Sequence, residues 1–78
     1  MGMTDKEKEK TKLLREKLKK YKDFDRDAWL IIGAFAFCKE SDEYGGSEHI
    51  LDEMIKLVEK NATLEGFMAD IGTLVGIE

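Results

Sequence analysis

The sequence contains no proline, and it has only one cysteine and one histidine among its 78 residues. Without proline nothing interrupts long helical runs, and the segments between the glycines are rich in residues that favour helix. The single cysteine, Cys38, excludes an internal disulfide framework and fits a reducing compartment. We therefore expect a cytoplasmic protein, one domain over residues 1–78, in which Cys38 is a small buried hydrophobe.

Motifs for catalysis and for cofactor binding are missing as well. With one histidine, no recognisable oxyanion loop and no phosphate-cradling glycine loop, no catalytic residue can be assigned. His49, Asp52 and Glu53 share a helix face, but a lone histidine is too little for the usual metal sites. Residues 23–27 begin like a calcium loop that lacks its required glycine and final glutamate. We expect no enzyme, no cofactor and no metal.

The most prominent feature that is present is an uncharged block, residues 28–38, between Asp27 and Lys39. A bilayer span needs about 20 apolar residues, so we expect no membrane insertion. The acidic residues before the block argue against a secretory leader. A strand over residues 30–37 competes with a helix, but the length and the lack of alternation favour helix. A helix that is apolar all round should be central, covered by the rest of the chain or by a second copy.

A basic helix is predicted for residues 5–21 at the N-terminal end. Thr4 and Glu7 have the spacing of a capping box at its start. Its apolar stripe is confined to its second half and comprises Leu13, Leu14, Leu18 and Tyr21. The basic turns within residues 1–12 should therefore be partly solvated. Intrahelical ion pairs such as Glu16–Lys20 should neutralise part of its charge.

Capping residues divide the rest of the chain into three further helices. These run from a cap at Asp23 or Asp25 to Lys39, from a Ser47 cap over residues 48–60 to Asn61, and from a Thr63 cap over residues 64–77. The last two each carry one apolar stripe. The predicted fold is all-α, a small bundle of three to four helices around the apolar helix, and we expect it to dimerise.

Small residues on the last helix indicate a protein contact. They lie opposite its apolar stripe. Each glycine lowers helix stability by about 0.8–1.0 kcal/mol relative to alanine. Several glycines on one solvent-facing side are therefore expected where another backbone packs closely against it. The alternative is a C-terminal helix that is simply weak. The aromatic residues of the apolar block add surface that short helices do not easily cover. The predicted partner interface is Trp29, Phe35, Phe37, Gly66, Ala69, Gly72 and Gly76.

Charge is unevenly distributed along the chain. Residues 1–22 hold nine Lys or Arg and four Asp or Glu, whereas residues 23–78 hold four and thirteen. An acidic surface could face a basic groove as a nucleic-acid mimic does, through Asp42, Glu43, Glu48, Asp52 and Glu53. We interpret the chain as a non-enzymatic helical protein–protein interaction module, a homodimer, and an adaptor or inhibitor of a larger protein.

Nucleic-acid binding is the alternative function. Residues 64–77 contain no Arg, Lys, Asn or Gln and cannot serve as a recognition helix. The Lys-rich N-terminal helix could contact phosphates instead, through Lys8, Lys12, Arg15 and Lys19. The glutamates interleaved with these residues favour intrahelical pairing, so nucleic acid ranks behind a protein partner.

Overall fold

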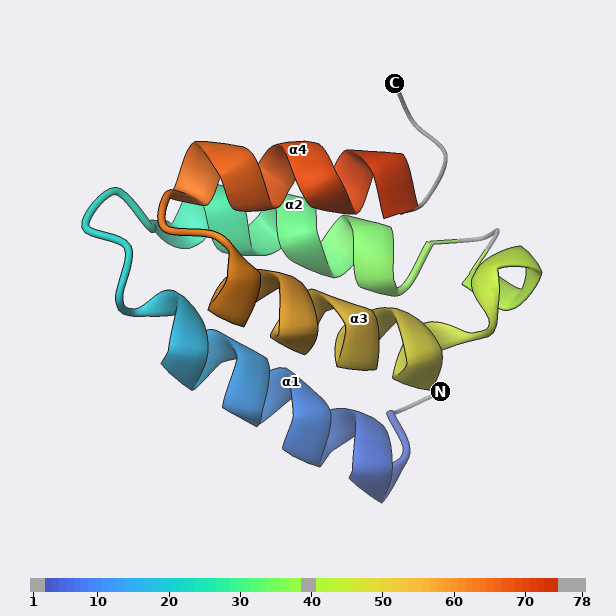
Figure 1. Cartoon of the computed structure of the whole chain (residues 1–78). Helices are drawn as coiled ribbons and strands as arrows, with labels where there is room; N and C mark the ends of the chain where they lie inside the picture. Colours follow the sequence, from blue (N-terminus) through green and yellow to red (C-terminus); the bar gives the residue numbers. More distant parts are fainter. Residues whose placement is uncertain (1–2, 39–40, 75–78) are drawn as a thin grey trace.

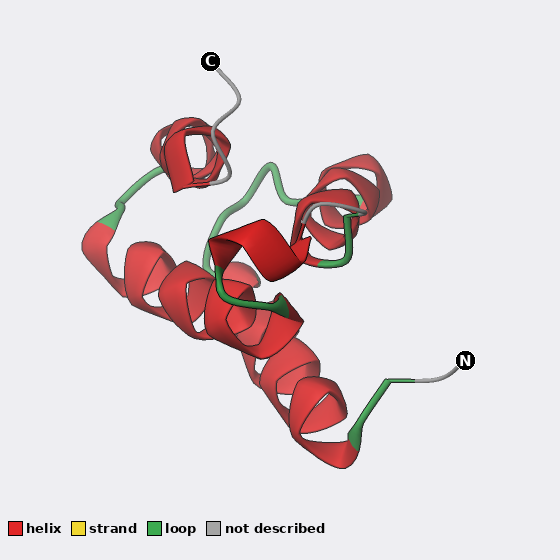
Figure 2. Ribbon diagram, turned by 90° about the vertical axis from the view of Figure 1, so that its right-hand side faces the viewer, coloured by secondary structure: helices red, strands yellow, loops and turns green. Residues whose placement is uncertain are grey.

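The computed structural model describes residues 3–38 and 41–74, and over this part of the chain it contains only helices and loops (Figure 2). The helices are α1 (Asp5–Leu18), α2 (Arg26–Ala36), η1 (Ser41–Tyr44), α3 (Ser47–Lys60) and α4 (Leu64–Leu74), where η1 is a 3-10 helix. The all-α prediction is therefore confirmed, with four α-helices in the described residues.

The helices α1 and α3 pack side by side and run in the same direction (Figure 1). The Lys10 ammonium lies 2.8 Å from the Asp52 carboxylate. Two helical turns further along α1, the Lys17 ammonium lies 2.9 Å from the Glu59 carboxylate. Both pairs have the same offset in sequence, so the two helices are parallel and in a fixed register. Leu14, between the two lysines, is fully buried.

Tyr21 closes the C-terminal end of α1 against α3 and α4. The helix ends at Leu18 instead of the predicted Tyr21, because the next amides donate to carbonyls three residues back. The Tyr21 ring is nevertheless buried, 6.3 Å from the Phe67 ring between centroids. Its hydroxyl lies 2.8 Å from the Asn61 carbonyl oxygen and 3.2 Å from that of Val58.

The expectation that the apolar helix is central is wrong for the single chain. The helix α2 buries Ile32 and Ala36 fully, but Leu30 is 57% exposed, Ile31 47% and Phe37 40%. The helix that contacts α1, α2, α4 and η1 is α3, whose four buried apolar residues face the core. Helix α2 is a helix as predicted, yet it lies on the outside of the bundle with one face uncovered.

Most helix starts follow the predicted caps. Thr4 and Glu7 form the capping box: the Glu7 amide donates to the Thr4 hydroxyl oxygen at 3.1 Å, and the Thr4 amide donates to the Glu7 carboxylate at 2.9 Å. Asp25, one of the two candidates, caps α2. The Thr63 hydroxyl oxygen accepts a hydrogen bond from an amide of the first turn of α4. These local signals depend only on neighbouring residues, which is why the sequence predicts them.

The start of α3 and the end of α2 differ from the predictions. Gly46, not Ser47, is the N-cap of α3, and no side chain caps this helix. Gly45 and Gly46 have φ values of +94° and +89°, so the chain enters α3 through a backbone turn that favours glycine. The helix α2 ends at Ala36, and the predicted end at Lys39 lies outside the described residues.

The neighbouring leucines of α1 provide a test of the packing between α1 and α3. Leu14 is fully buried, whereas Leu13 is 48% exposed. We expect Leu14→Ala to lower the free energy of unfolding by about 2–5 kcal/mol, the usual cost of a core cavity, and Leu13→Ala to lower it by less than about 1 kcal/mol. Urea unfolding followed by circular dichroism measures both, and equal losses would contradict this register.

Tyr21 provides a second test, with a defined pH dependence. Burial raises the pKa of the Tyr21 phenol above its ordinary value. The unfolded chain therefore loses this proton first, and stability falls as the pH rises above about 10. Tyr21→Phe should cost about 1 kcal/mol at neutral pH, where the hydroxyl donates a hydrogen bond, and should reduce the alkaline loss of stability. An alkaline loss as large as that of the unmodified chain would contradict the burial of this phenol.

Candidate functional site

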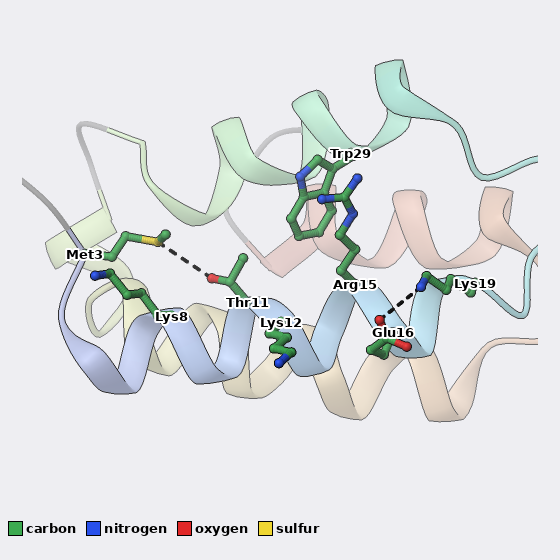
Figure 3. A pocket seen from close by; sticks show the side chains of 8 residues that line it. All are labelled: Met3, Lys8, Thr11, Lys12, Arg15, Glu16, Lys19 and Trp29. Atoms are coloured by element: carbon green, nitrogen blue, oxygen red, sulfur yellow. Dashed lines mark hydrogen bonds and ion pairs between the residues drawn. The ribbon is translucent and has the colours of Figure 1, made fainter.

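A groove between α1 and α2 gathers cationic side chains and the only tryptophan of the chain (Figure 3). Its volume is about 390 Å³, within the size range of ligand sites. Its lining residues are Met3, Lys8, Thr11, Lys12, Arg15, Glu16, Lys19 and Trp29. We call this feature the basic groove.

The spacing of the cations along α1 produces the row that forms one wall of the basic groove. The members of this row are separated by four, three and four residues, so they project from one side of the helix. At 1.5 Å per residue the row is about 16 Å long. Its members, all exposed, are Lys8, Lys12, Arg15 and Lys19. These are the four residues considered above for phosphate contact, and the structure brings them together.

The cations that face α3 are neutralised by α3. The hydrogen bond to Asp52 raises the pKa of the Lys10 ammonium, and Glu48 lies 3.6 Å from the same ammonium. On the next turns, the hydrogen bond from Lys17 lowers the pKa of the Glu59 carboxyl. These pairs are exposed to solvent, so they contribute little to stability. Their main effect is on charge, because they remove these lysines from the charge available to a ligand.

The cations of the basic groove are mostly not neutralised. Lys19 pairs with Glu16 at 3.0 Å, so the predicted Glu16–Lys20 pair is wrong. Lys20 instead donates to a carbonyl oxygen of α3 at 2.6 Å. Within residues 3–38 and 41–74, the Lys8, Lys12 and Arg15 side chains have no carboxylate partner within ion-pair distance. Arg15 has no carboxylate three or four residues away in the sequence, and Glu16, four residues after Lys12, pairs with Lys19 instead.

Trp29 forms the opposite wall of the basic groove. The Arg15 guanidinium lies over the Trp29 ring, 5.3 Å from its centroid, and Figure 3 shows the Arg15 side chain extending from α1 to that ring. Phe24 also packs against Trp29, with ring centroids 6.3 Å apart and planes at 82°. Trp29 was predicted to contact a protein partner. Sequence reasoning could not place it here, because its position depends on how α2 packs beside α1.

The other residues of the predicted partner interface lie apart from the basic groove. Phe37, the residue directly after α2, is exposed, whereas Phe35 on α2 is half-buried against the core. On α4, Ala69 is exposed and Gly72 half-buried, and Gly76 lies outside the described residues. Among the described residues of the predicted interface, Phe37 and Ala69 are the exposed ones.

A contact within the chain itself explains why glycine occupies position 66. A Cβ at this position would lie 2.8 Å from the Asn61 side-chain oxygen. That side chain is held in place, because its amide nitrogen donates to the Leu57 carbonyl and the Asp70 carboxylate, both at 2.9 Å. Close approach of the loop between α3 and α4 thus explains this glycine without a partner helix.

The predicted acidic surface is largely engaged in ion pairs. The Lys10 ammonium forms ion pairs with the Glu48 and Asp52 carboxylates, at 3.6 and 2.8 Å. The Glu53 carboxylate pairs with the Lys56 ammonium at 3.1 Å. The remaining members, Asp42 and Glu43, are exposed on η1. The geometry therefore gives little support to a continuous carboxylate surface that mimics nucleic acid.

Comparisons and searches for other sites add no functional assignment. No group of three or more His, Cys, Asp or Glu in the described residues could hold a metal ion, and His49 is exposed on α3. The described part of the chain has no helix of the length and apolarity that a membrane span requires. Cys38 is half-buried.

No protein-family model, curated protein sequence or solved structure matches the chain.

Two helix glycines test the explanation given for Gly66. A Cβ at Gly33 meets no atom within 4 Å, so Gly33→Ala should raise the free energy of unfolding by about 0.5–1 kcal/mol through helix propensity. Gly66→Ala should lower it by about 1 kcal/mol or more, because the new methyl group displaces the Asn61 side chain. Equal stabilisation by both substitutions, measured by urea unfolding, would contradict the close approach.

Proposed function

We propose that this chain is a non-enzymatic interaction module that pairs with a second copy of itself through the uncovered face of α2. One observation carries the proposal: Leu30 and Ile31 on α2, and Phe37 directly after its last residue, are large apolar side chains that are all substantially exposed. Their spacing of one, six and seven residues places them along one side of α2. Burial of such residues against a partner is favourable in proportion to the apolar area removed from water.

The arrangement of side chains on this face suits pairing with an identical helix. The uncovered α2 face consists of Leu30, Ile31, Ala34 and Phe37, with large residues on both sides of the small Ala34. If two copies of α2 cross antiparallel at Ala34, the leucine and isoleucine of one copy meet the phenylalanine of the other. Such a contact is isologous, because each copy contributes the same surface. Gly33, with open space where its Cβ would be, lets the two backbones approach.

The uncovered α2 face supports this proposal better than the acidic surface does. Its large apolar residues are left 40–57% exposed by the part of the chain that the structure describes, whereas three of the five acidic residues already pair with lysines. The proposal of an adaptor or inhibitor that acts through free carboxylates therefore has the weaker support.

The association should be weak. Three half-exposed apolar residues per copy gain on the order of 1 kcal/mol each when they are covered. Association costs at least about 4 kcal/mol in lost freedom of motion. We therefore expect a dimer that forms at high protein concentration and dissociates on dilution.

Sedimentation equilibrium over a series of protein concentrations tests the dimer. We expect the average mass to rise from that of the 8.9 kDa monomer towards twice that value as the concentration increases. Ile31→Lys should keep the chain monomeric over the same series, because it places a charge opposite the Phe37 of the other copy within the apolar contact.

Leu13→Lys is the matched control for this substitution. Leu13 on α1 is as exposed as Ile31, at 48% against 47%, but it does not belong to the uncovered α2 face. This variant should associate like the unmodified chain. A chain that stays monomeric at every concentration, or equal effects of the two substitutions, would overturn the proposed dimer.

A further inference from the structure

We propose that the basic groove binds a single-stranded nucleic acid, with phosphates along the cation row of α1 and a base stacked at the Trp29–Arg15 pair. The inference is independent of the dimer, because the uncovered α2 face and the basic groove lie on different sides of α2. Trp29 points towards α1 in Figure 3, whereas Leu30 and Ile31 are exposed. The proposal that the basic groove binds a single strand depends on the placement of charge and on the geometry of the aromatic wall.

The charge of the groove favours a polyanion despite the net charge of −4 of the whole chain. Four cations and one carboxylate line the groove, and only Lys19 among the cations is paired, with Glu16. The acidic residues that would compensate the row are held elsewhere, where Glu48, Asp52 and Glu59 pair with the lysines that face α3. A backbone with regularly repeated negative charges fits a row that presents about one cation per 5.4 Å turn.

The aromatic wall favours a nucleic acid over other polyanions. Bases in single strands stack on aromatic rings and on guanidinium planes, and proteins that bind single strands combine such surfaces with a basic groove. Trp29 and Arg15 supply both groups: the guanidinium lies over the indole, 5.3 Å from the ring centroid, and its outer face is the surface on which a base stacks. Phe24 packs against the indole at 82°, so the indole is held in position before a ligand arrives.

A single strand suits this site better than a duplex. In a duplex the bases are stacked on one another and paired, so Trp29 could reach only the backbone and the groove edges. An acidic peptide would satisfy the lysines, but it offers no planar group for the Trp29–Arg15 pair. A duplex and an acidic peptide are therefore the ligands with which binding of a single strand must be compared.

The fluorescence of Trp29 reports directly on the groove, because the sequence contains no other tryptophan. Titration of the full chain with a short oligothymidine at low salt should quench this fluorescence with a saturable curve. The logarithm of the binding constant should fall with the logarithm of salt concentration with a slope of about −2 to −3, as expected for up to four phosphate contacts in a single strand. The corresponding duplex and a polyglutamate peptide should bind more weakly and quench little.

Two pairs of variants test the two parts of the site. The first pair distinguishes phosphate contact by the cation row from a general effect of net charge, and the second distinguishes stacking on an aromatic ring from filling of the groove by an apolar side chain. Lys12→Gln should weaken binding about five-fold and make the salt slope shallower by about 0.7, the share of one phosphate contact in a single strand. Lys56→Gln makes the same charge change on α3, outside the groove, and should leave binding unchanged. With a dye-labelled strand, Trp29→Leu should weaken binding by about five-fold or more, whereas Trp29→Phe should retain most of it.

Several outcomes would overturn the inference. They are an absence of quenching at low salt, equal binding of the duplex or of polyglutamate, and equal effects of Lys12→Gln and Lys56→Gln. Lys12 is exposed, so its substitution does not threaten folding, and circular dichroism checks each variant.

Discussion

The packing of α1 on α3 is the interaction on which the rest of the structure depends. Leu14, Leu18 and Tyr21 enter the core from α1, and they fix the rotation of that helix about its axis. Once this rotation is set, Lys10 and Lys17 must face the carboxylates of α3, and the row from Lys8 to Lys19 must face away from them. A helix with nearly uniform basic composition is thereby divided into a neutralised side and a charged side.

The position of α2 follows from what α1 and α3 leave open. Because α3 contacts every other helix, α2 buries little more than Ile32 and Ala36, and it contributes Trp29 to the basic groove. The opposite side of α2 then has no cover within the chain. The proposed dimer and the proposed strand-binding groove thus come from two sides of one helix, and both depend on its peripheral place.

Local features of this fold could be predicted from the sequence, but the relative placement of helices could not. The capping box at Thr4 and the Asp25 cap depend on residues three or four apart, and they are present as predicted. The central place expected for the apolar helix was inferred from composition, and within the single chain it is wrong, because composition does not say how many neighbours a helix has. The four cations of the groove were identified by residue type and spacing, whereas Trp29 joins them only through tertiary packing.

The most direct test of the central claim, the parallel register of α1 on α3, is a set of nuclear Overhauser effects from the Tyr21 ring in an isotopically labelled sample. The structure places this ring 6.3 Å from the Phe67 ring between centroids, and its hydroxyl 3.2 Å from the Val58 carbonyl oxygen. Cross-peaks from Tyr21 to both Phe67 and Val58 are therefore expected. Cross-peaks from Tyr21 to residues at the N-terminal end of α3, in place of these, would show that α1 packs in another direction and would contradict the account.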